Sequence, residues 1–314
     1  MKEPLRRSVG IAIVNWNAGD QLQQCVTSIA DARWDAVRLD SVVIVDNGST
    51  DGSIERLTCP PGLPMRVVKN GGNLGFAVAC NQAARSIETD FLLFLNPDTV
   101  LESESIPTAV SWLEDPAQAS TGIVGIQLVD MQGRVSRSCA RFPTLATLVV
   151  AALGLDQMMP SMFASYRMND WDHSESREVD HVIGAFFLVR REVFKIVNGF
   201  DEQFFVYFED LDFSLRARQA GWHSFYLTAA RALHRGGGTS EQIKSTRLFY
   251  SLRSRLHYVR KHFTRPAALA VVFLTLVIEP VVRLTACVIG LSSTGARDTL
   301  GAYRSLWASR WGVL

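Results

Sequence analysis

Two groups of side chains in this sequence have residue types and spacing that suit metal binding or general-base catalysis. The first is Asp98, which ends the tripeptide Asn96-Pro97-Asp98 directly after the apolar residues 91–95. A carboxylate at a strand end can hold Mg²⁺ or Mn²⁺ while substrate phosphates and waters fill the other positions, and the imidazole of His234 could supply a further ligand. Asn-Pro-Asp is also a common turn, and a lone histidine is more often a structural hydrogen-bonding group, so these alternatives stay open.

The second group is the acidic cluster of Glu209, Asp210 and Asp212, which follows the aromatic residues 204–208. A carboxylate within hydrogen-bond reach of an alcohol can act as a general base and take its proton as a new bond forms. Adjacent acids near the start of a helix are also common capping residues. The cluster therefore indicates either a general base or an ordinary helix start.

The elements that position these groups follow from the apolar pattern of the first hundred residues. Continuous β-branched runs, typical of strands buried on both faces, alternate with apolar residues at helical spacing. The expected strands are residues 9–14, 41–45, 65–68 and 91–95, and the expected helices are residues 20–32, a short helix opened by the turn at 46–52, and residues 75–86. This order predicts an α/β fold with a mostly parallel sheet and helices on both faces.

The pattern is less regular in the second half of the sequence. We expect strands at residues 122–129, 182–189 and 204–208, a helix at 212–220, and an irregular lid or insertion at 140–180. Polar clusters follow three of the earlier strands, at Asn15-Trp16-Asn17, at Asp46-Asn47-Gly48-Ser49 and at Asn96-Pro97-Asp98. Ligands of parallel sheets bind at such strand ends. Because neither G-x-G-x-x-G nor a P-loop motif occurs, dehydrogenases and P-loop enzymes are disfavoured.

Charge is distributed unevenly along the chain. The formal net charge is +1, which disfavours a dedicated nucleic-acid binder, so we expect no nucleic-acid partner. Residues 1–240 carry a net charge of −7, whereas residues 241–265 hold seven basic residues and one acidic residue. Five widely spaced cysteines without a C-x-x-C pair are expected to be reduced core residues of a cytoplasmic protein.

The C-terminal part, residues 241–314, is expected to be a helical tail. Residues 241–264 have the pattern of a basic amphipathic helix, and residues 266–291 are mostly apolar. The longest uninterrupted apolar run, residues 267–278, has 12 residues, fewer than the roughly 20 that a spanning helix needs. We therefore expect residues 241–291 to lie in or dip into a membrane surface, with basic side chains at anionic headgroups. Packing on the body or on a second subunit is the alternative.

Eight ordered motifs together resemble glycosyltransferase family 2, and most closely its rhamnosyltransferase-type members, which build bacterial surface polysaccharides such as O-antigen. The resemblance covers roughly residues 9–262. The motifs are Val14-Asn15-Trp16-Asn17, Val45-Asp46-Asn47-Gly48-Ser49-Thr50-Asp51-Gly52, Asn73-Leu74-Gly75-Phe76-Ala77-x-Ala79-x-Asn81, Leu95-Asn96-Pro97-Asp98, Gly184-Ala185-Phe186, Gly199-Phe200-Asp201-Glu202-x-Phe204-Phe205, Glu209-Asp210-x-Asp212 and His234.

The resemblance implies a GT-A catalytic domain at residues 1–240, with a donor half at about 1–100 and an acceptor half at about 120–240. It implies a nucleotide diphosphate sugar as donor, with Asp46 bonding the base or ribose and Trp16 near the base. Asn73 and Gly75 would line the nucleotide pocket, and Gly184 and Ala185 would form the floor beside the sugar. The remaining residues of this nucleotide-sugar set are Asn15, Asn17, Asn47 and Asn96.

The resemblance also implies roles for the acidic groups. Asp98 corresponds to the last acid of the family's D-x-D motif, so it would hold Mg²⁺ or Mn²⁺, and His234 matches a position that can supply another ligand. Asn96 replaces the first acid of that motif, which would weaken the metal site. Asp210 matches the inverting base, and Glu209 is the alternative base.

Together these observations predict a metal-dependent inverting enzyme that adds one sugar to a hydroxyl of a glycan or lipid-linked glycan acceptor at the inner face of the cytoplasmic membrane. The expected donor is dTDP-L-rhamnose, with another nucleotide-activated hexose as the alternative. The Q-x-x-R-W motif and the several membrane helices of processive synthases are absent from the sequence. A nucleotidyltransferase and a non-catalytic sugar-nucleotide binding protein remain competing interpretations, and a homo-oligomer is compatible with all of them.

Overall fold

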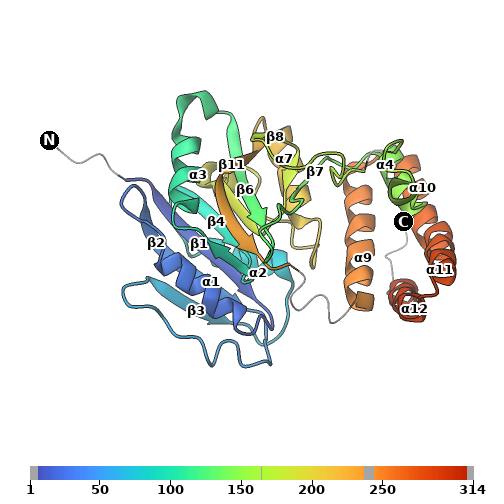
Figure 1. Ribbon diagram of the computed structural model, residues 1–314, viewed down its shortest axis with the longest axis horizontal. Coiled ribbons are helices and arrows are strands. Elements are labelled where there is room, and N and C mark those ends of the chain that lie inside the picture. Colours follow the sequence, from blue (N-terminus) through green and yellow to red (C-terminus); the bar gives the residue numbers. More distant parts are fainter. Residues whose placement is uncertain (1–5, 164, 237–243, 310–314) are drawn as a thin grey trace.

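A computed structural model of the chain describes residues 6–163, 165–236 and 244–309, in which a β-sheet with flanking helices lies beside a group of C-terminal helices (Figure 1). The main sheet of this described part has nine strands. In spatial order they are β3 (Met65–Lys69), β2 (Arg38–Asp46), β1 (Ser8–Asn15), β4 (Phe91–Leu95), β10 (Phe186–Arg190), β6 (Thr121–Val129), β11 (His223–His234) and β5 (Thr99–Leu101), with β8 (Arg177–Val179) paired to β11.

The strand directions confirm the mostly parallel α/β sheet. Strands β3, β2, β1 and β4 are mutually parallel, β10 runs against them, and β6 and β11 return to the first direction. In the register of the pairs, Asn15 lies opposite Asp46, and Ile13 lies opposite Leu95. The polar residues that follow these strands are therefore brought to one edge of the sheet.

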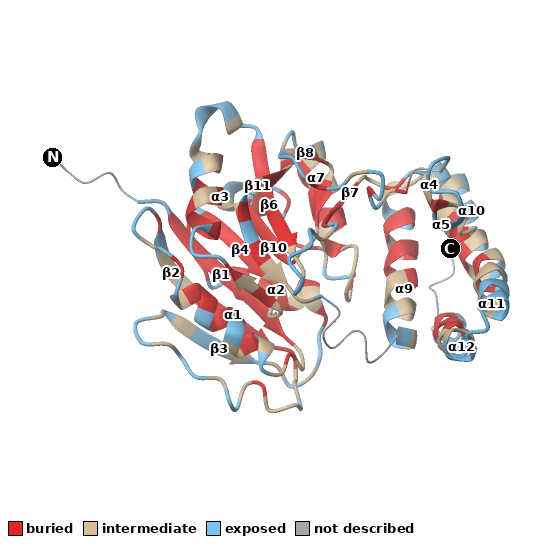
Figure 2. Cartoon of the chain, viewed as in Figure 1, coloured by how far each residue is buried: buried red, intermediate tan, exposed pale blue. Residues whose placement is uncertain are grey.

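Both faces of the sheet are covered, because alternate residues of each strand point to opposite sides. From β1, Ile11 and Ile13 pack with helices α1 (Gln21–Ala30) and α3 (Ser105–Glu114), whereas Ala12 and Val14 pack with α2 (Phe76–Ala84). Helices α6 (Arg191–Ile196) and α7 (Glu209–Gln219) join the second layer. Figure 2 shows the buried residues concentrated in the sheet between these helices. The unbroken apolar strands are explained by this burial on both faces.

Two local predictions were wrong. Residues 47–64 contain turns rather than the short helix expected after residues 46–52. Residues 204–208 are not a strand, because Tyr207 and Phe208 adopt left-handed backbone angles, with φ of 68° and 67°. The turn that they form starts α7 at Glu209, three residues earlier than expected.

The predicted strand at residues 182–189 is interrupted. Its first part, β9 (His181–Val182), pairs with β7 (Cys139–Ala140), and a turn at residues 183–185 separates it from β10. The predicted irregular segment 140–180 also contains regular structure, namely α4 (Leu145–Ala152), α5 (Leu155–Met158) and β8. Thr144 begins α4 with a capping box that it forms with Thr147, a local signal that was present in the sequence.

The cysteines depart in part from the expected core positions. Cys25, Cys80 and Cys139 are buried, but Cys59 is exposed and Cys287 is half-buried.

The described C-terminal residues form three continuous helices, and residues 241–243 and 310–314 of the predicted tail lie outside the described part. Helix α9 (Lys244–His262) is followed by a continuous helix, Arg265–Ile289, made of α10 (Arg265–Phe273), a π-helical turn (Leu274–Ile278) and α11 (Glu279–Ile289), and then by α12 (Ser293–Ala308). Among the described residues this 25-residue helix alone is long and apolar enough to cross a membrane, by length and composition. The expectation that the apolar segment is too short was therefore wrong.

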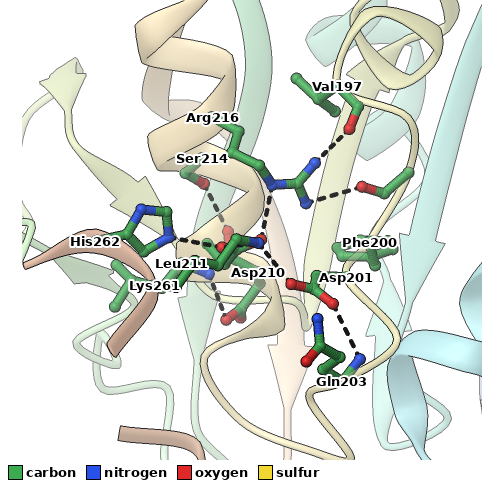
Figure 3. Close-up of polar contacts among 12 residues, drawn as sticks. Val197, Phe200, Asp201, Gln203, Asp210, Leu211, Ser214, Arg216, Lys261 and His262 are labelled. Carbon is green, nitrogen blue, oxygen red and sulfur yellow. Dashed lines mark hydrogen bonds and ion pairs between the residues drawn. The ribbon is translucent and has the colours of Figure 1, made fainter. Parts of the chain in front are cut away.

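A cluster of charges around the buried Asp212 joins α9 to the elements that cover the sheet (Figure 3). The carboxylate of Asp212, in α7, accepts hydrogen bonds from His262 Nε2 and Arg216 Nε and contacts Lys261 Nζ, each at 2.7 Å. Lys261 also contacts Asp201 at 2.6 Å. Burial by itself would raise the pKa of Asp212, but the hydrogen bond from His262 and the charges of Arg216 and Lys261 lower it to about 2.

We predict that Asp212→Asn lowers the free energy of unfolding by about 2 kcal/mol, because it removes the charge of a buried carboxylate that accepts charge-assisted hydrogen bonds from partly exposed cations. Urea denaturation at neutral pH measures this difference, with the exposed Asp35→Asn as a control that should change little. Since the pKa of Asp212 is lower in the folded chain than its usual value near 4, its contribution is complete above about pH 4 and is lost as the pH falls towards 2. Equal stability of the two variants would contradict the prediction.

Candidate functional site

Two cavities adjoin beside the sheet, and the first of them lies at the carboxyl ends of β1, β2 and β4. The first, about 600 Å³, is here called the Asp98 cavity; the predicted site residues that line it are Trp16, Asn47, Asn73, Asn96, Asp98 and His234. The second, about 640 Å³, is called the Asp210 cavity; Glu209 and Asp210 line it together with His181. Tyr207 and Arg247 line both cavities. The arrangement separates a candidate metal pair from a candidate base across a shared wall.

Two predicted contact residues, Asn15 and Asp46, lie behind the wall of the Asp98 cavity. Asn15 is fully buried, and its Nδ2 donates to Asp46 Oδ1 at 2.8 Å and to the hydroxyls of Ser49 and Ser53 at 2.9 Å. The other oxygen of Asp46 accepts from the backbone N–H of Ser49 at 3.2 Å. These bonds fix the loop after β2. A direct contact of Asp46 with a base or ribose stays a prediction.

Asn17 has a similar place at the loop after β1. Its backbone N–H donates to Ser49 Oγ, and its Oδ1 accepts from Thr50 N–H at 2.8 Å. The left-handed φ of 52° at Asn17 is tolerated because asparagine adopts this region more readily than most residues. Asn17 thus ties the loop that carries Trp16 to the loop after β2.

A chain of amides holds the loop before α2 against the Asp98 cavity. Asn47 Nδ2 donates to Gly75 O at 3.0 Å, and Asn73 Oδ1 accepts from Gly75 N–H at 3.0 Å. Gly75 has a φ of 96°, and a Cβ placed there would lie 2.7 Å from Phe205 O. The next residue, Phe76, donates its N–H to the same oxygen. Glycine is required here both for its backbone angle and for the close approach of residues 204–208.

We predict that Gly75→Ala lowers the free energy of unfolding by about 1–3 kcal/mol more than Gly133→Ala does, because its Cβ would be overpacked against Phe205. Gly133 also has a left-handed φ, of 74°, but a Cβ there would meet nothing within 4 Å, so this variant measures the backbone cost alone. Chemical denaturation of both variants provides the comparison. Equal losses would show that the contact with Phe205 relaxes without cost.

Asp98 and His234 form the pair that fits a divalent cation. His234 Nε2 lies 3.4 Å from Asp98 Oδ1, and both side chains are mostly buried. Asp98 Oδ1 is buried and has no hydrogen-bond partner among the described residues. The pairing of β5 with β11, and a bond from Arg235 N–H to Asp98 O at 3.1 Å, hold the two residues together. A carboxylate oxygen aimed at an imidazole suits Mg²⁺ or Mn²⁺.

The protein would supply few of the ligands of such a cation. In the described ranges there is no group of three or more His, Cys, Asp and Glu side chains arranged for a metal. Mg²⁺ usually binds one or two carboxylates and completes its shell with substrate phosphates and water. Asn96 also lines the cavity, with an uncharged amide where a second carboxylate would bind more strongly.

Asp210, in the first turn of α7, is held by backbone hydrogen bonds. Its Oδ2 accepts from Gly184 N–H at 2.9 Å, and its Oδ1 accepts from Leu211 N–H at 2.8 Å. His181 Nε2 lies 3.6 Å from Oδ2, and burial lowers the pKa of that histidine. Gly184 and Ala185 are not among the residues that line the two cavities, but their backbone bonds a lining residue of each, because Ala185 O accepts from Asn96 N–H at 3.1 Å. These two residues therefore position the side chains of the site.

Glu209 differs sharply from its neighbour. It is 5% exposed, and its Oε2 has no hydrogen-bond partner among the described residues. Burial, together with the negative charge of Asp210, raises the pKa of Glu209 well above its usual value. Its side chain is also held away from the solvent-accessible part of the cavity by this burial. Of the two predicted bases, Asp210 has the better geometry.

Sequence reasoning missed Tyr207 and Arg247, the two residues that line both cavities. Left-handed angles at residues other than glycine cost about 1–3 kcal/mol and concentrate at functional sites. Tyr207 and Phe208 adopt such angles in succession directly before Glu209. No sequence signal marks this turn, and Arg247 was grouped with the basic residues of the tail.

Solved structures with similar folds include two complexes with sugar nucleotides. The mannosyltransferase PcManGT of Pyrobaculum calidifontis, in complex with GDP-Man and Mn²⁺, aligns with a TM-score of 0.57 at 16% identity, over 98% of this chain and 92% of its own. TarS 1–349 of S. aureus, in complex with UDP-GlcNAc, aligns with a TM-score of 0.54 at 14% identity, over 95% and 92% of the two chains. These likenesses confirm the predicted GT-A type fold.

Sequence comparison identifies the family. The N-acetylglucosaminyl-diphospho-decaprenol L-rhamnosyltransferase of Mycobacterium tuberculosis is 30% identical over 239 residues, covering 71% of this chain and 75% of that protein. Rhamnosyltransferase WbbL of Escherichia coli K12 is 28% identical over 193 residues, covering 61% and 70%. Residues 6–267 match the family described as glycosyltransferase like family 2. The chain therefore belongs to glycosyltransferase family 2 and is a glycosyltransferase with a GT-A type fold.

Proposed function

We propose that this enzyme transfers one L-rhamnose from dTDP-L-rhamnose, with inversion, to a hydroxyl of a lipid-linked glycan acceptor in cell-surface polysaccharide synthesis. The observation that carries this proposal is the pair of adjoining cavities, with Asp98 and His234 in one and Asp210 in the other. A donor in the first cavity and an acceptor in the second would meet at their shared wall. The names of the two rhamnosyltransferase relatives support the choice of sugar.

Each group of the site has a defined task in this reaction. Asp98 and His234 would hold a divalent cation, which supplies Lewis-acid stabilisation of the charge that grows on the leaving diphosphate. Asp210 would accept the proton of the acceptor hydroxyl as its oxygen attacks the anomeric carbon. The new carbon–oxygen bond forms on the face opposite the diphosphate, which leaves with the electron pair of the broken bond. No proton donor to the leaving group is then needed.

The decisive experiment measures release of nucleoside diphosphate from a panel of nucleotide sugars by purified protein with Mg²⁺ or Mn²⁺. We expect release from dTDP-L-rhamnose that is stimulated by an N-acetylglucosaminyl diphosphoryl lipid and abolished by EDTA. If the acceptor stimulates release from a different sugar nucleotide, that compound is the donor instead of dTDP-L-rhamnose. Binding without release from any donor would contradict the proposal in favour of a non-catalytic binding protein, and release of pyrophosphate from nucleoside triphosphates would favour a nucleotidyltransferase.

We also propose that the enzyme lies at the inner face of the cytoplasmic membrane and binds it through the C-terminal helices. Exposed apolar side chains recur along one side of the 25-residue helix, at Leu269, Phe273, Val277, Val281 and Val288. The opposite side is tied to the protein, because Arg255 of α9 forms a buried ion pair with Glu279 and donates to Thr275. Figure 2 shows that exposed residues line the outer side of α11. A second copy of this chain on the same stripe is the alternative.

We predict that Val281→Asp weakens sedimentation with vesicles containing phosphatidylglycerol about tenfold, because burial of one valine contributes roughly 1.5 kcal/mol. The control is Ser305→Asp, which adds the same charge at an exposed position of α12. Unchanged sedimentation of Val281→Asp, with a shift from dimer to monomer, would assign the stripe to a second copy instead.

A further inference from the structure

The Asp210 cavity is cationic, although the body of the protein is acidic. Six cationic side chains and three acidic side chains line it among the described residues; the cations are Arg137, Arg167, Lys244, Arg247, Arg255 and Arg283. One of the three acids, Glu209, is 5% exposed, so its carboxyl group is largely covered by protein. A cavity that holds only a neutral sugar and a catalytic base does not require this excess of positive charge.

Five of the six cations divide into two sets, and the sixth, Arg167, lies over the ring of Tyr166 and donates to its hydroxyl. Arg255 and Arg283 have a structural role, since both form ion pairs with the buried Glu279. The other set is Arg137, Lys244 and Arg247, none of which forms an ion pair with an acidic side chain among the described residues. These three cations come from two distant parts of the chain, the loop before β7 and the first turn of α9. Cations that converge on one cavity without a protein counter-charge indicate an anionic ligand.

The rim of the same cavity leads to apolar surface. Asp156 and Gln157 of α5 and Arg283 of α11 line it, so the short helix α5 and the apolar helix meet there. Met158, the last residue of α5, and Met162, which follows α5 in the chain, are 75% and 68% exposed. On α11, Val281 is 62% exposed. A ligand with an anionic centre and an apolar end would find complementary surface at both ends of this path.

We propose that Arg137, Lys244 and Arg247 bind the diphosphate that joins the acceptor sugar to its lipid, and so place the sugar hydroxyl at Asp210. This assignment rests on the proposed transfer to a lipid-linked acceptor. A diphosphate diester carries about two negative charges, and guanidinium groups bind phosphate oxygens in pairs of hydrogen bonds. The cavity has room for a sugar ring between the cations and the base, and the lipid would leave along the apolar rim.

The test compares Arg137→Gln with wild type on two acceptors in neutral detergent. One is the N-acetylglucosaminyl diphosphoryl lipid, and the other carries the same sugar on an uncharged alkyl chain. We expect Arg137→Gln to raise KM for the diphosphate acceptor at least tenfold while KM for the alkyl glycoside and for the donor stay unchanged. Lys244→Gln should behave in the same way. Arg304→Gln, which removes an exposed cation of α12, is the matched control and should resemble wild type.

Inorganic pyrophosphate provides a second readout that needs no turnover. It should protect wild type against thermal unfolding, and Arg137→Gln should lose part of that protection. Equal KM ratios for the two acceptors in wild type and in both variants would overturn the assignment while leaving sugar transfer intact. Absence of transfer to any acceptor would instead refute the proposed function. A KM effect that appears only when phosphatidylglycerol is added would assign the cations to lipid headgroups and would also overturn it.

Discussion

Asp210→Asn is expected to lower kcat about 10²–10⁴-fold while the affinity for the sugar nucleotide stays within a factor of two of wild type. Asparagine keeps the shape of the side chain and can still accept the hydrogen bond from Gly184 N–H, so the fold around the first turn of α7 should survive. What the amide cannot do is take a proton from the acceptor hydroxyl. Initial rates at saturating acceptor, with nucleotide binding by calorimetry, separate the two effects.

Glu209→Gln is the matched control for this variant. Glu209 is buried and its pKa is raised by that burial, so the neutral amide of glutamine suits the same environment. Its kcat should therefore remain within several-fold of wild type. Full activity of Asp210→Asn together with an inactive Glu209→Gln would move the role of base to Glu209.

The second large effect is expected at Asp98. Asp98→Asn should weaken Mn²⁺-dependent binding of dTDP about 100-fold or more, because the variant replaces a buried carboxylate, one of the two protein ligands that we assign, by a neutral amide. Binding of dTDP in EDTA should be nearly unchanged, since the contacts of the base and sugar remain. Calorimetric titrations of dTDP with and without Mn²⁺ measure the difference.

The exposed Asp35→Asn serves again as a control for charge alone. It should keep the full response to Mn²⁺. Equal loss of dTDP affinity with and without Mn²⁺ in Asp98→Asn would show that Asp98 contacts the nucleotide directly. Unchanged binding under both conditions would remove Asp98 from the site.

The strands of the sheet could be predicted because their apolar composition is a local property of the sequence. Residues 9–14 and 91–95 are unbroken apolar runs, and a strand buried on both faces leaves no other choice of residue. The aromatic residues 204–208 have equally strong strand composition, yet they form a turn. Their backbone is decided by contacts from elsewhere, since Phe205 O accepts from Phe76 N–H. Local propensity carries no information about such a partner.

The site residues also divide into those that sequence motifs reveal and those that only the fold places. Asp98, His234 and Asp210 were found because short motifs surround them, and the structure places them on the two cavities. Asn15 belongs to an equally clear motif, but burial assigns its side chain to the loop after β2. Arg247 could not be found from the sequence, because its place depends on the return of α9 to the strand ends.

Helix α9 is engaged at both ends, and this limits how its length can vary. Lys261 and His262 meet Asp212 at its C-terminal end, while Lys244 and Arg247 line the cavities at its N-terminal end. Each added residue of an α-helix turns what precedes it by about 100° and shifts it by about 1.5 Å. A single insertion between the two ends would therefore rotate both cations away from the cavity without altering any side chain of the site. The number of residues in this helix is as much a part of the site as their identity.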